Sequence, residues 1–532
     1  MSPGLLSAGL GSVPAEQTYL DISQGNRVFD SLYDSKLPRD IGGGICGPPY
    51  SRAVVERAES APADIVPGLL ASTLEEAGKR CRVRSLDLRH LSMLVRGLRG
   101  NDLVLAIERA PPGMNRQLAV GIAGRGFDGD LTSDSTRTDG YVLSTDVAPT
   151  ILGRLGIAAP SVMSGQAIRA EGSVDVGAIE SLGDRMGVIS ERRGPVIGVS
   201  LAVWLVLLGL ALLARGRVAR VAVRVVGLSV IYLPLVLLLG AALEPSKGVE
   251  QLLVMLGAPL LAALTLLALG GYRAIAVASG VVVLAYAIDV VAGSPLTSLS
   301  LLGPNPGLGV RFYGIGNELE ALLGVLVVAG TGAGLAGFGA QLSPRRCAAA
   351  FLAIGLFFAL VFAAGRFGAD VGAAIVLPVG AAVAAAAIAA RSRRTALLVI
   401  AAPLLVLALI ALADLVSGAN AHLTRSVLDA GGLGDLADVA QRRLQLSAHS
   451  FTRPVVLIFL PVIVALAIFA VLRRDRFGVL LENFPAMRAG LLGALAATVI
   501  GTLANDSGAL LLEIGAAYLL VFASFAWSER VS

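Results

Sequence analysis

The sequence predicts an α/β extracytoplasmic domain followed by an all-α polytopic membrane domain of about eleven transmembrane helices. The chain has 532 residues, of which 55% are hydrophobic and 15% charged, whereas soluble globular proteins are about 25% charged. Runs apolar enough to cross a bilayer begin near residue 196 and continue to the C-terminal region. Before them, short strand-like and helical patterns alternate, as in α/β folds. We therefore predict a domain at 1–175, a juxtamembrane linker at 176–195 and a transmembrane domain at 196–532.

Within the N-terminal domain, turn and capping residues delimit the expected elements. Residues 65–78 predict a helix, with Pro67 near its start and Gly78 as its stop. A second helix is expected at 145–157, with Pro149 in its first turn. Strand-like segments are expected at 81–86, 101–107 and 118–123.

The chain contains three cysteines, too few for a disulfide scaffold. Cys46 and Cys81 lie in the N-terminal domain, and Cys347 opens an apolar run. Cys46 and Cys81 either form one disulfide, as an extracytoplasmic location permits, or remain as two buried thiols. Cys347 is interpreted as a packing residue.

Each predicted span is about 17–24 residues long, which matches the hydrocarbon thickness of a bilayer. The expected spans are 196–214, 221–243, 251–270, 274–293, 317–340, 347–365, 370–390, 395–417, 454–472, 487–504 and 509–527.

Arginines alternate along the connections between these spans. Every second connection carries them: Arg215, Arg217, Arg220, Arg273, Arg345, Arg346, Arg391, Arg393, Arg394, Arg473, Arg474, Arg476 and Arg488. The positive-inside rule makes these connections cytoplasmic. We therefore expect a multi-pass protein of the bacterial cytoplasmic membrane, with its N-terminal domain extracytoplasmic and its C-terminus cytoplasmic. The basic residues punctuate apolar runs rather than clustering on a soluble face, which argues against nucleic acid as a partner.

An extracytoplasmic domain needs an export signal, and the first residues lack a basic segment followed by a long apolar one. Two explanations stay open. Either the first span translocates its own N-terminal tail, or the true start lies upstream and supplies a signal anchor. We favour the second.

The stretch GYVLSTDVAPTILGRLGIAAP at 140–160, continuing to Met163-Ser-Gly, resembles the C-terminal end of the alkaline phosphatase and sulfatase superfamily. The resemblance covers about 25 residues and implies that superfamily's α/β fold. Its enzymes hold divalent metals with several Asp and His residues around a Ser or Thr nucleophile, whereas this domain has one histidine, His90. We interpret the domain as a degenerate, non-catalytic and N-terminally truncated relative without a metal centre. Four acids remain as conceivable hard-cation ligands, although Asp146 is more simply a helix N-cap: Asp21, Asp30, Asp34 and Asp146.

Acidic residues in the membrane domain gather at the predicted outer ends of spans: Asp289, Glu318, Glu320, Asp370, Asp414, Asp506 and Glu513. Three motifs place glycine beside such an acid: GIGNE at 314–318, GRFGAD at 365–370 and NDSG at 505–508. A helix end with freed backbone groups can bind an ion or a polar group. Ordinary caps and packing glycines are the alternative. The predicted substrate-binding or ion-binding residues are Asn317, Glu318, Arg366, Asp370, Asn505, Asp506 and Ser507.

The predicted outer loop 418–453 has apolar residues spaced for one helical face, which indicates an interfacial helix. These residues are Leu436, Val439, Leu444 and Leu446. The loop is either a solvated connection or a segment whose basic residues grip an anionic phosphate. The candidate anion contacts in this loop are His422, Arg425 and Arg453. Arg311, which lies shortly before the GIGNE motif, is a fourth candidate.

The membrane half also resembles a group of uncharacterised bacterial multi-span membrane proteins, which often carry a phosphatase-like extracytoplasmic part. The resemblance rests on RFYGIGNE at 311–318, AHLTR at 421–425 and NDSG at 505–508. This resemblance implies no particular activity. Three functions stay open: transport of a polar or lipid-linked substrate, transfer or hydrolysis of a lipid-linked phosphate or glycan, and a non-catalytic envelope scaffold or receptor. Transport is slightly favoured. The expected partners are membrane lipids and either a lipid-linked envelope precursor or a cation, and the sequence identifies no cofactor or metal.

Overall fold

The computed structural model describes the chain except for residues 48–49, 340–341, 390–400, 402–404, 406–407, 410–443, 473–480 and 531–532. It divides into two compact units. The N-terminal unit comprises Met1–Ser190 and Pro304–Phe312, and the membrane unit comprises Glu191–Gly303 and Tyr313–Ser532. The first unit thus contains the predicted domain and also a short segment from far along the chain.

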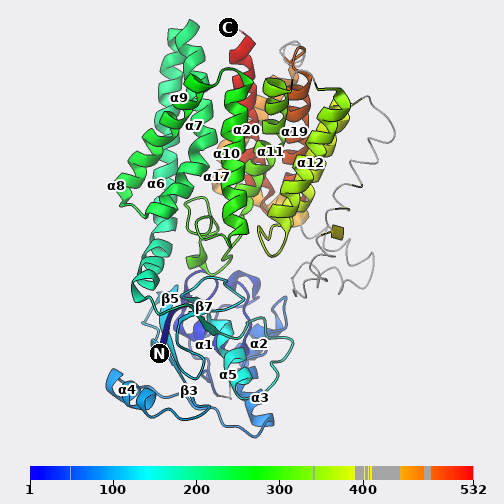
Figure 1. The fold of residues 1–532 in the computed structure, drawn as a ribbon. Helices are drawn as coiled ribbons and strands as arrows, with labels where there is room; N and C mark the ends of the chain where they lie inside the picture. The colour runs from blue at the N-terminus through cyan, green and yellow to red at the C-terminus, as the bar shows by residue number, and fades with distance from the viewer. Residues whose placement is uncertain are drawn as a thin grey trace. The chain divides into compact units, whose positions relative to one another are not determined.

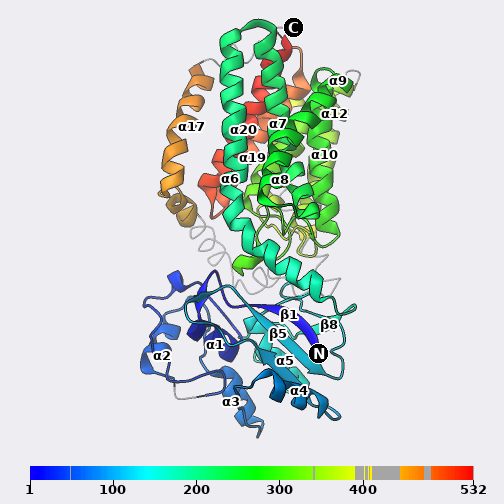
Figure 2. The same ribbon diagram turned by 90° about the vertical axis from the view of Figure 1, so that its left-hand side faces the viewer.

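A four-stranded mixed sheet organises the N-terminal unit, with strand order β3-β5-β1-β7. Its strands are β1 (Ser2–Ser7), β3 (Leu103–Ile107), β5 (Gln117–Gly124) and β7 (Tyr141–Leu143). β5 pairs antiparallel with β1 and β3, while β7 pairs parallel with β1. Two small sheets pair β2 (Val13–Pro14) with β4 (Met114–Asn115), and β6 (Asp130–Thr132) with β8 (Arg169–Glu171). Figure 2 shows β1 and β5 side by side.

Short helices lie between these strands along the chain. They are α1 (Ala15–Gln24), α2 (Arg52–Glu59), α3 (Leu69–Glu76), α4 (Leu88–Arg96) and α5 (Val147–Arg154). Leu6 of β1 and Ile122 of β5 are buried in one cluster with Ile22 of α1, and Leu70 of α3 packs in another with Leu152 of α5. Burying such side chains contributes about 1.5–3 kcal/mol each.

The predicted α/β character of this region is confirmed, with one local exception. Strands and helices form close to the expected segments 101–107, 118–123, 65–78 and 145–157. Residues 81–86, expected as a strand, lie in no strand. Their side chains beyond Cys81 are exposed, so alternation here does not mark a buried sheet face.

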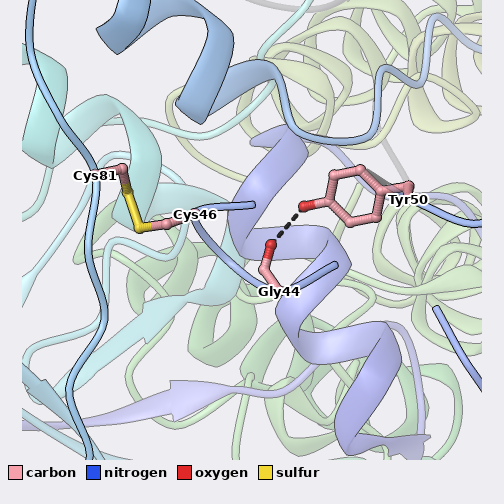
Figure 3. The surroundings of a disulfide bond; sticks show 4 residues. All are labelled: Gly44, Cys46, Tyr50 and Cys81. Atoms are coloured by element: carbon pink, nitrogen blue, oxygen red, sulfur yellow. Dashed lines mark hydrogen bonds between the residues drawn. A yellow bond between two sulfur atoms is a disulfide. The ribbon is translucent and has the colours of Figure 1, made fainter. Parts of the chain in front are cut away.

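Cys46 and Cys81 form a disulfide that joins positions 35 residues apart. Figure 3 shows this bond near Tyr50, whose hydroxyl donates to the carbonyl of Gly44. Of the two alternatives for these cysteines, the structure contains the bridge. Cys347 is a free, buried thiol in the membrane unit.

Replacing Cys46 and Cys81 together by Ser is expected to lower the stability of the N-terminal unit by about 3 kcal/mol, because an open loop regains chain entropy on unfolding. Pulse proteolysis of the full chain in micelles measures this change through cleavage of the N-terminal unit. Cys347→Ser is the matched control and should leave that cleavage unchanged. An equal stability of the double variant and the native chain would contradict the prediction.

Among the described residues, eight helices are long and apolar enough to cross a membrane. They are α6 (Val176–Ala214), α7 (Gly216–Leu243), the continuous run of α8 (Lys247–Leu252), η3 (Leu253–Gly257) and α9 (Ala258–Ala268), then α10 (Tyr272–Val291), α11 (Asn317–Phe338), α12 (Pro344–Ala363), α19 (Pro485–Ala504) and α20 (Gly508–Arg530). Two further apolar helices are α13 (Ala373–Ile388) and α17 (Pro454–Leu472). Figure 1 labels these helices apart from α13.

The positions of these helices agree with the predicted spans, apart from two regions. Most of the expected span 395–417 lies outside the described residues. The segment 176–195, expected as a juxtamembrane linker, is helical and forms the first part of α6. Helix α6 is therefore longer than its apolar run alone predicts.

Glycines bring the central helix α19 close to two neighbours. A Cβ on Gly332 of α11 would lie 2.9 Å from Cα of Gly490 of α19. A Cβ on Gly493 of α19 would overlap the backbone carbonyl of Gly380 of α13. Small residues allow such close backbone approach in membrane helices. Helix α19 therefore packs tightly against both α11 and α13.

Candidate functional site

The three glycine-and-acid motifs, which are far apart in the sequence, meet in the membrane unit. The backbone N–H of Ile315, in GIGNE, donates to the carbonyl of Gly368, in GRFGAD, at 3.0 Å. Gly314 has φ +77°, and a Cβ there would overlap the same carbonyl. The turn before α11 is thereby joined to the turn between α12 and α13.

Side-chain hydrogen bonds connect the start of α11 with the turn between α19 and α20. The Asn317 amide donates to Oδ1 of Asp506 at 3.2 Å. The Asn505 amide donates to Oε2 of Glu320 at 2.7 Å and lies 3.3 Å from Oδ1 of Asn317. The NDSG motif is thus bonded to the helix that GIGNE begins.

The third motif approaches the same point through Gly372. A Cβ on Gly372 would overlap the carboxylate of Glu320, so the turn before α13 lies directly against that side chain. The N–H of Gly372 donates to Oδ1 of Asp370 at 2.8 Å. We call the set Asn317, Glu320, Asp370, Asn505 and Asp506 the polar junction.

Burial differs within the polar junction. Glu320, Asp370 and Asn505 are 2%, 3% and 8% exposed, whereas Asp506 is exposed to solvent. The first turns of α11 and α20 lie beside these acids, and the partial positive charge of a helix N-terminus stabilises a nearby carboxylate. Carboxylates in such surroundings can exchange a proton or bind a cationic or hydroxyl group.

Glu318 has a different partner. It forms an ion pair with Arg193 of α6, with 3.5 Å between Oε1 and Nη1, and both side chains are about one-third exposed. Arg193 also donates to the carbonyl of Gly303. Among the acids of α11, the structure therefore places Glu320 in the polar junction and pairs Glu318 with an arginine.

The remaining predicted residues lie in several places. Arg366 is exposed, and Ser507 is half-buried with its backbone N–H donating to Oδ1 of Asn505. Arg311 lies in the segment that belongs to the N-terminal unit. Arg453 is exposed just before α17. The other two predicted anion contacts, His422 and Arg425, lie outside the described residues.

Two serines that the sequence analysis did not select also contact the NDSG turn. Ser447 donates to the carbonyl of Thr502 at 2.6 Å, and Ser450 accepts from the N–H of Ala509 at 3.0 Å. They lie in the helical segment 444–450, at the end of the predicted outer loop. Both are buried, whereas Leu444 and Leu446 are exposed. The predicted apolar face, of which the structure describes Leu444 and Leu446, is therefore not the face that contacts the NDSG turn.

In the N-terminal unit, Asp146 is buried and occupies the expected N-cap position of α5. It precedes α5, but its side chain makes no capping bond to that helix. Its oxygens accept instead from the hydroxyls of Ser133 and Ser135, at 2.7 and 2.6 Å, and from two backbone N–H groups, those of Leu143 and Gln166. Asp146 therefore stands at the predicted N-cap position, but its carboxylate bonds to these four donors and not to the first turn of α5. Burial raises the pKa of Asp146, and the four hydrogen bonds oppose that rise.

Of the other three acids considered as cation ligands, Asp30 and Asp21 bond to protein side chains through their carboxylates. Asp30 pairs with Arg57 at 2.7 Å. The backbone N–H of Asp34 donates to Ser60. Asp21 accepts from Gln17 at 2.7 Å. Among the described residues, no group of three or more His, Cys, Asp or Glu side chains is arranged to hold a metal ion.

Burial raises the pKa of Asp21 to about 7, against opposing effects of the Gln17 hydrogen bond and of the charges of Arg27 and Arg57. Because the folded pKa exceeds the unfolded value of 3.8, the folded state binds this proton more tightly. The resulting stabilisation is complete below pH 3.8 and is lost as the pH rises through 7.

We therefore expect the N-terminal unit to be about 2–3 kcal/mol less stable at pH 8 than at pH 5. Asp21→Asn should remove most of this change of stability with pH. The smaller change that remains comes from Asp146, whose raised pKa acts in the same direction. Hydrogen exchange of β1 and β5 amides, corrected for intrinsic rates, measures the difference in the full chain. A variant whose pH dependence equals that of the native chain would exclude Asp21 as its source.

Comparison with protein-family models, curated proteins and solved structures finds no match to this chain. What the structure and composition establish is an integral membrane protein with several spans and a mixed α/β N-terminal region.

Proposed function

We propose that the membrane unit moves a polar or lipid-linked envelope substrate at the outer face of the cytoplasmic membrane, with the polar junction as the site that binds substrate or coupling ion. One observation carries this proposal. Two of the side-chain bonds in the junction join residues 189 and 185 positions apart. Helix caps that serve one helix each would bond locally and would not bring three motifs together.

The chemistry of the junction favours a cation or proton as the coupling species. It combines three carboxylates with two side-chain amides, and two of the carboxylates are buried. A buried carboxylate between membrane helices is costly, and such residues mark ion and substrate pathways. Moving a proton on and off Glu320 would change its bond to Asn505. That change offers a way to couple occupancy to helix movement.

The disulfide supports the proposed orientation of the N-terminal unit. Disulfides form and persist in oxidising compartments outside the cytoplasm. The Cys46–Cys81 bridge therefore agrees with the side to which the arginine pattern assigns this unit.

A second candidate function is transfer or hydrolysis of a lipid-linked phosphate or glycan. Arg193, half-buried beside Glu318, and the exposed Arg366 are cations that can bind a phosphate. The degenerate phosphatase-like resemblance of the N-terminal unit is compatible with either function. An envelope scaffold or receptor is the third.

Liposomes that contain the purified full chain and a trapped pH-sensitive dye test the proposal. An inward Na⁺ gradient or a K⁺ diffusion potential should drive proton movement, and Glu320→Gln should abolish it. If protons move no faster in liposomes that contain the native chain than in protein-free liposomes, cation-coupled transport is excluded. Release or transfer of phosphate from added polyprenyl phosphate would then identify the enzyme, and inactivity in both assays would favour the scaffold.

A further inference from the structure

The N-terminal unit binds a segment of the connection between α10 and α11. This segment, Pro304–Phe312, is here called the strap, and it includes the short helix η4 (Pro306–Leu308). Three of its carbonyl groups accept hydrogen bonds from the N-terminal unit. The hydroxyl of Tyr141 donates to Pro306 at 3.1 Å, the N–H of Gly11 to Leu308 at 2.7 Å, and Nη2 of Arg27 to Gly309 at 2.9 Å.

Aromatic and close backbone contacts complete the binding of the strap. The ring of Phe312 lies 5.9 Å from that of Tyr141 and 5.7 Å from the guanidinium of Arg27, measured to ring centroids. Gly309 has φ +67°, and a Cβ there would overlap the carbonyl of Gly9. The strap is therefore recognised through both its backbone and its final aromatic residue.

The strap lies beyond the carboxyl end of β1, an inner strand of the sheet. Gly9 and Gly11 are two and four residues past the end of β1, and Tyr141 is the first residue of β7, the parallel neighbour of β1. Burial lowers the pKa of Arg27, and the charges of Asp21 and Asp146 oppose that change. The N-terminal unit thus presents a built binding surface, and a segment of the same chain occupies it.

Four residues, 313–316, connect the strap to α11, and they span at most about 14 Å. Two of them are bonded within the membrane unit: the N–H of Gly314 donates to the Ser294 hydroxyl at 2.9 Å, and that of Ile315 to the Gly368 carbonyl. Asn317, a member of the polar junction, begins α11 immediately afterwards. The strap and α11 are therefore joined by a short covalent connection, of which Gly314 and Ile315 are bonded within the membrane unit.

We infer that the N-terminal unit is a receptor for the strap and that, by holding it, the unit fixes the start of α11 and the geometry of the polar junction. This role needs no catalytic chemistry in the N-terminal unit. It also does not depend on which substrate the membrane unit handles.

Hydrogen–deuterium exchange of the full chain in lipid nanodiscs tests this inference. Tyr141→Phe removes one strap bond and keeps the ring, while Phe312→Ala removes the aromatic contacts from the strap side. Each variant should raise exchange about ten-fold in the strap, as expected for the loss of one such interaction, and should also raise it in residues 313–320. Exchange in β1 and β5 should stay as in the native chain.

Tyr33→Phe is the matched control, because Tyr33 is a buried tyrosine that stacks on Arg57 in the same unit. It should change exchange in neither the strap nor residues 313–320. Faster exchange confined to the strap, or unchanged exchange throughout, would overturn the inference. If Tyr141→Phe also raises exchange in β1 and β5, the test of the inference rests on Phe312→Ala. That variant leaves every residue of Met1–Ser190 unchanged.

Discussion

Glu320→Gln is expected to abolish the proposed cation movement, with a loss of at least about ten-fold, while leaving the membrane unit folded. The reason is the bond at 2.7 Å between the Asn505 amide and Oε2 of Glu320. A glutamine carbonyl can accept the same hydrogen bond but cannot bind or release a proton near neutral pH. Flux in liposomes measures the loss, and the fluorescence of Trp204 and Trp527, both in the membrane unit, reports whether it stays folded.

Glu318→Gln is the matched control, since it makes the same change two residues earlier on the same helix. Glu318 pairs with Arg193 at 3.5 Å at a partly exposed site, where an ion pair contributes about 0–1 kcal/mol. Its substitution should leave most of the flux. Glu320→Ala should in addition lower stability by about 1–3 kcal/mol, because the buried Asn505 amide loses an acceptor. Equal flux in the Glu318 and Glu320 variants would remove Glu320 from the proposed mechanism.

Gly314→Ala is expected to destabilise the membrane unit by about 4 kcal/mol, the largest loss of stability that we predict. Its φ of +77° lies in the left-handed region, which costs a residue with a Cβ about 1–2 kcal/mol. A Cβ there would also overlap the carbonyl of Gly368, and relieving such overlap costs about 1–3 kcal/mol more. The overlap would separate the turn before α11 from the turn between α12 and α13. Chemical unfolding in mixed micelles measures the difference.

Gly316→Ala, two residues away in the same turn, is the comparison for this measurement. Gly316 has φ −92°, and a Cβ there would lie 3.4 Å from a carboxylate oxygen of Glu318, which is ordinary contact. Its substitution should change stability by less than about 1 kcal/mol. Similar losses in the two variants would mean that the contact between Gly314 and Gly368 contributes little to the fold.

Local patterns in the sequence were sufficient to locate the membrane-spanning helices that the structure describes. The length of apolar runs such as 221–243 and 274–293 predicts α7 and α10, because a helix must be about 20 residues long to cross the hydrocarbon layer. Turn residues likewise predict α5 and β5 in the N-terminal unit. Such features depend on neighbouring residues, so a single sequence contains the information needed to predict them.

Residue type and position also identified the three motifs, because a structural turn at a span end does not by itself require an acid beside its glycine. Their convergence was a hypothesis that composition alone could not test. The sequence pattern pointed to Glu318, whereas the structure bonds Glu320 to Asn505 and pairs Glu318 with Arg193. Two acids that are two residues apart lie on nearly opposite faces of a helix, and the choice between them depends on which helices pack against each face of α11.

The sequence by itself therefore determined that this protein spans the membrane several times, that an α/β region precedes the spans, and where polar residues enter the apolar helices. Tertiary structure alone decided that Cys46 bonds Cys81, that four donors surround Asp146, that the strap joins the N-terminal unit, and that three motifs form one junction. The physical reason is the range of the interactions. Helical periodicity and apolar length act over one or two turns, whereas each of these pairings depends on how distant segments pack.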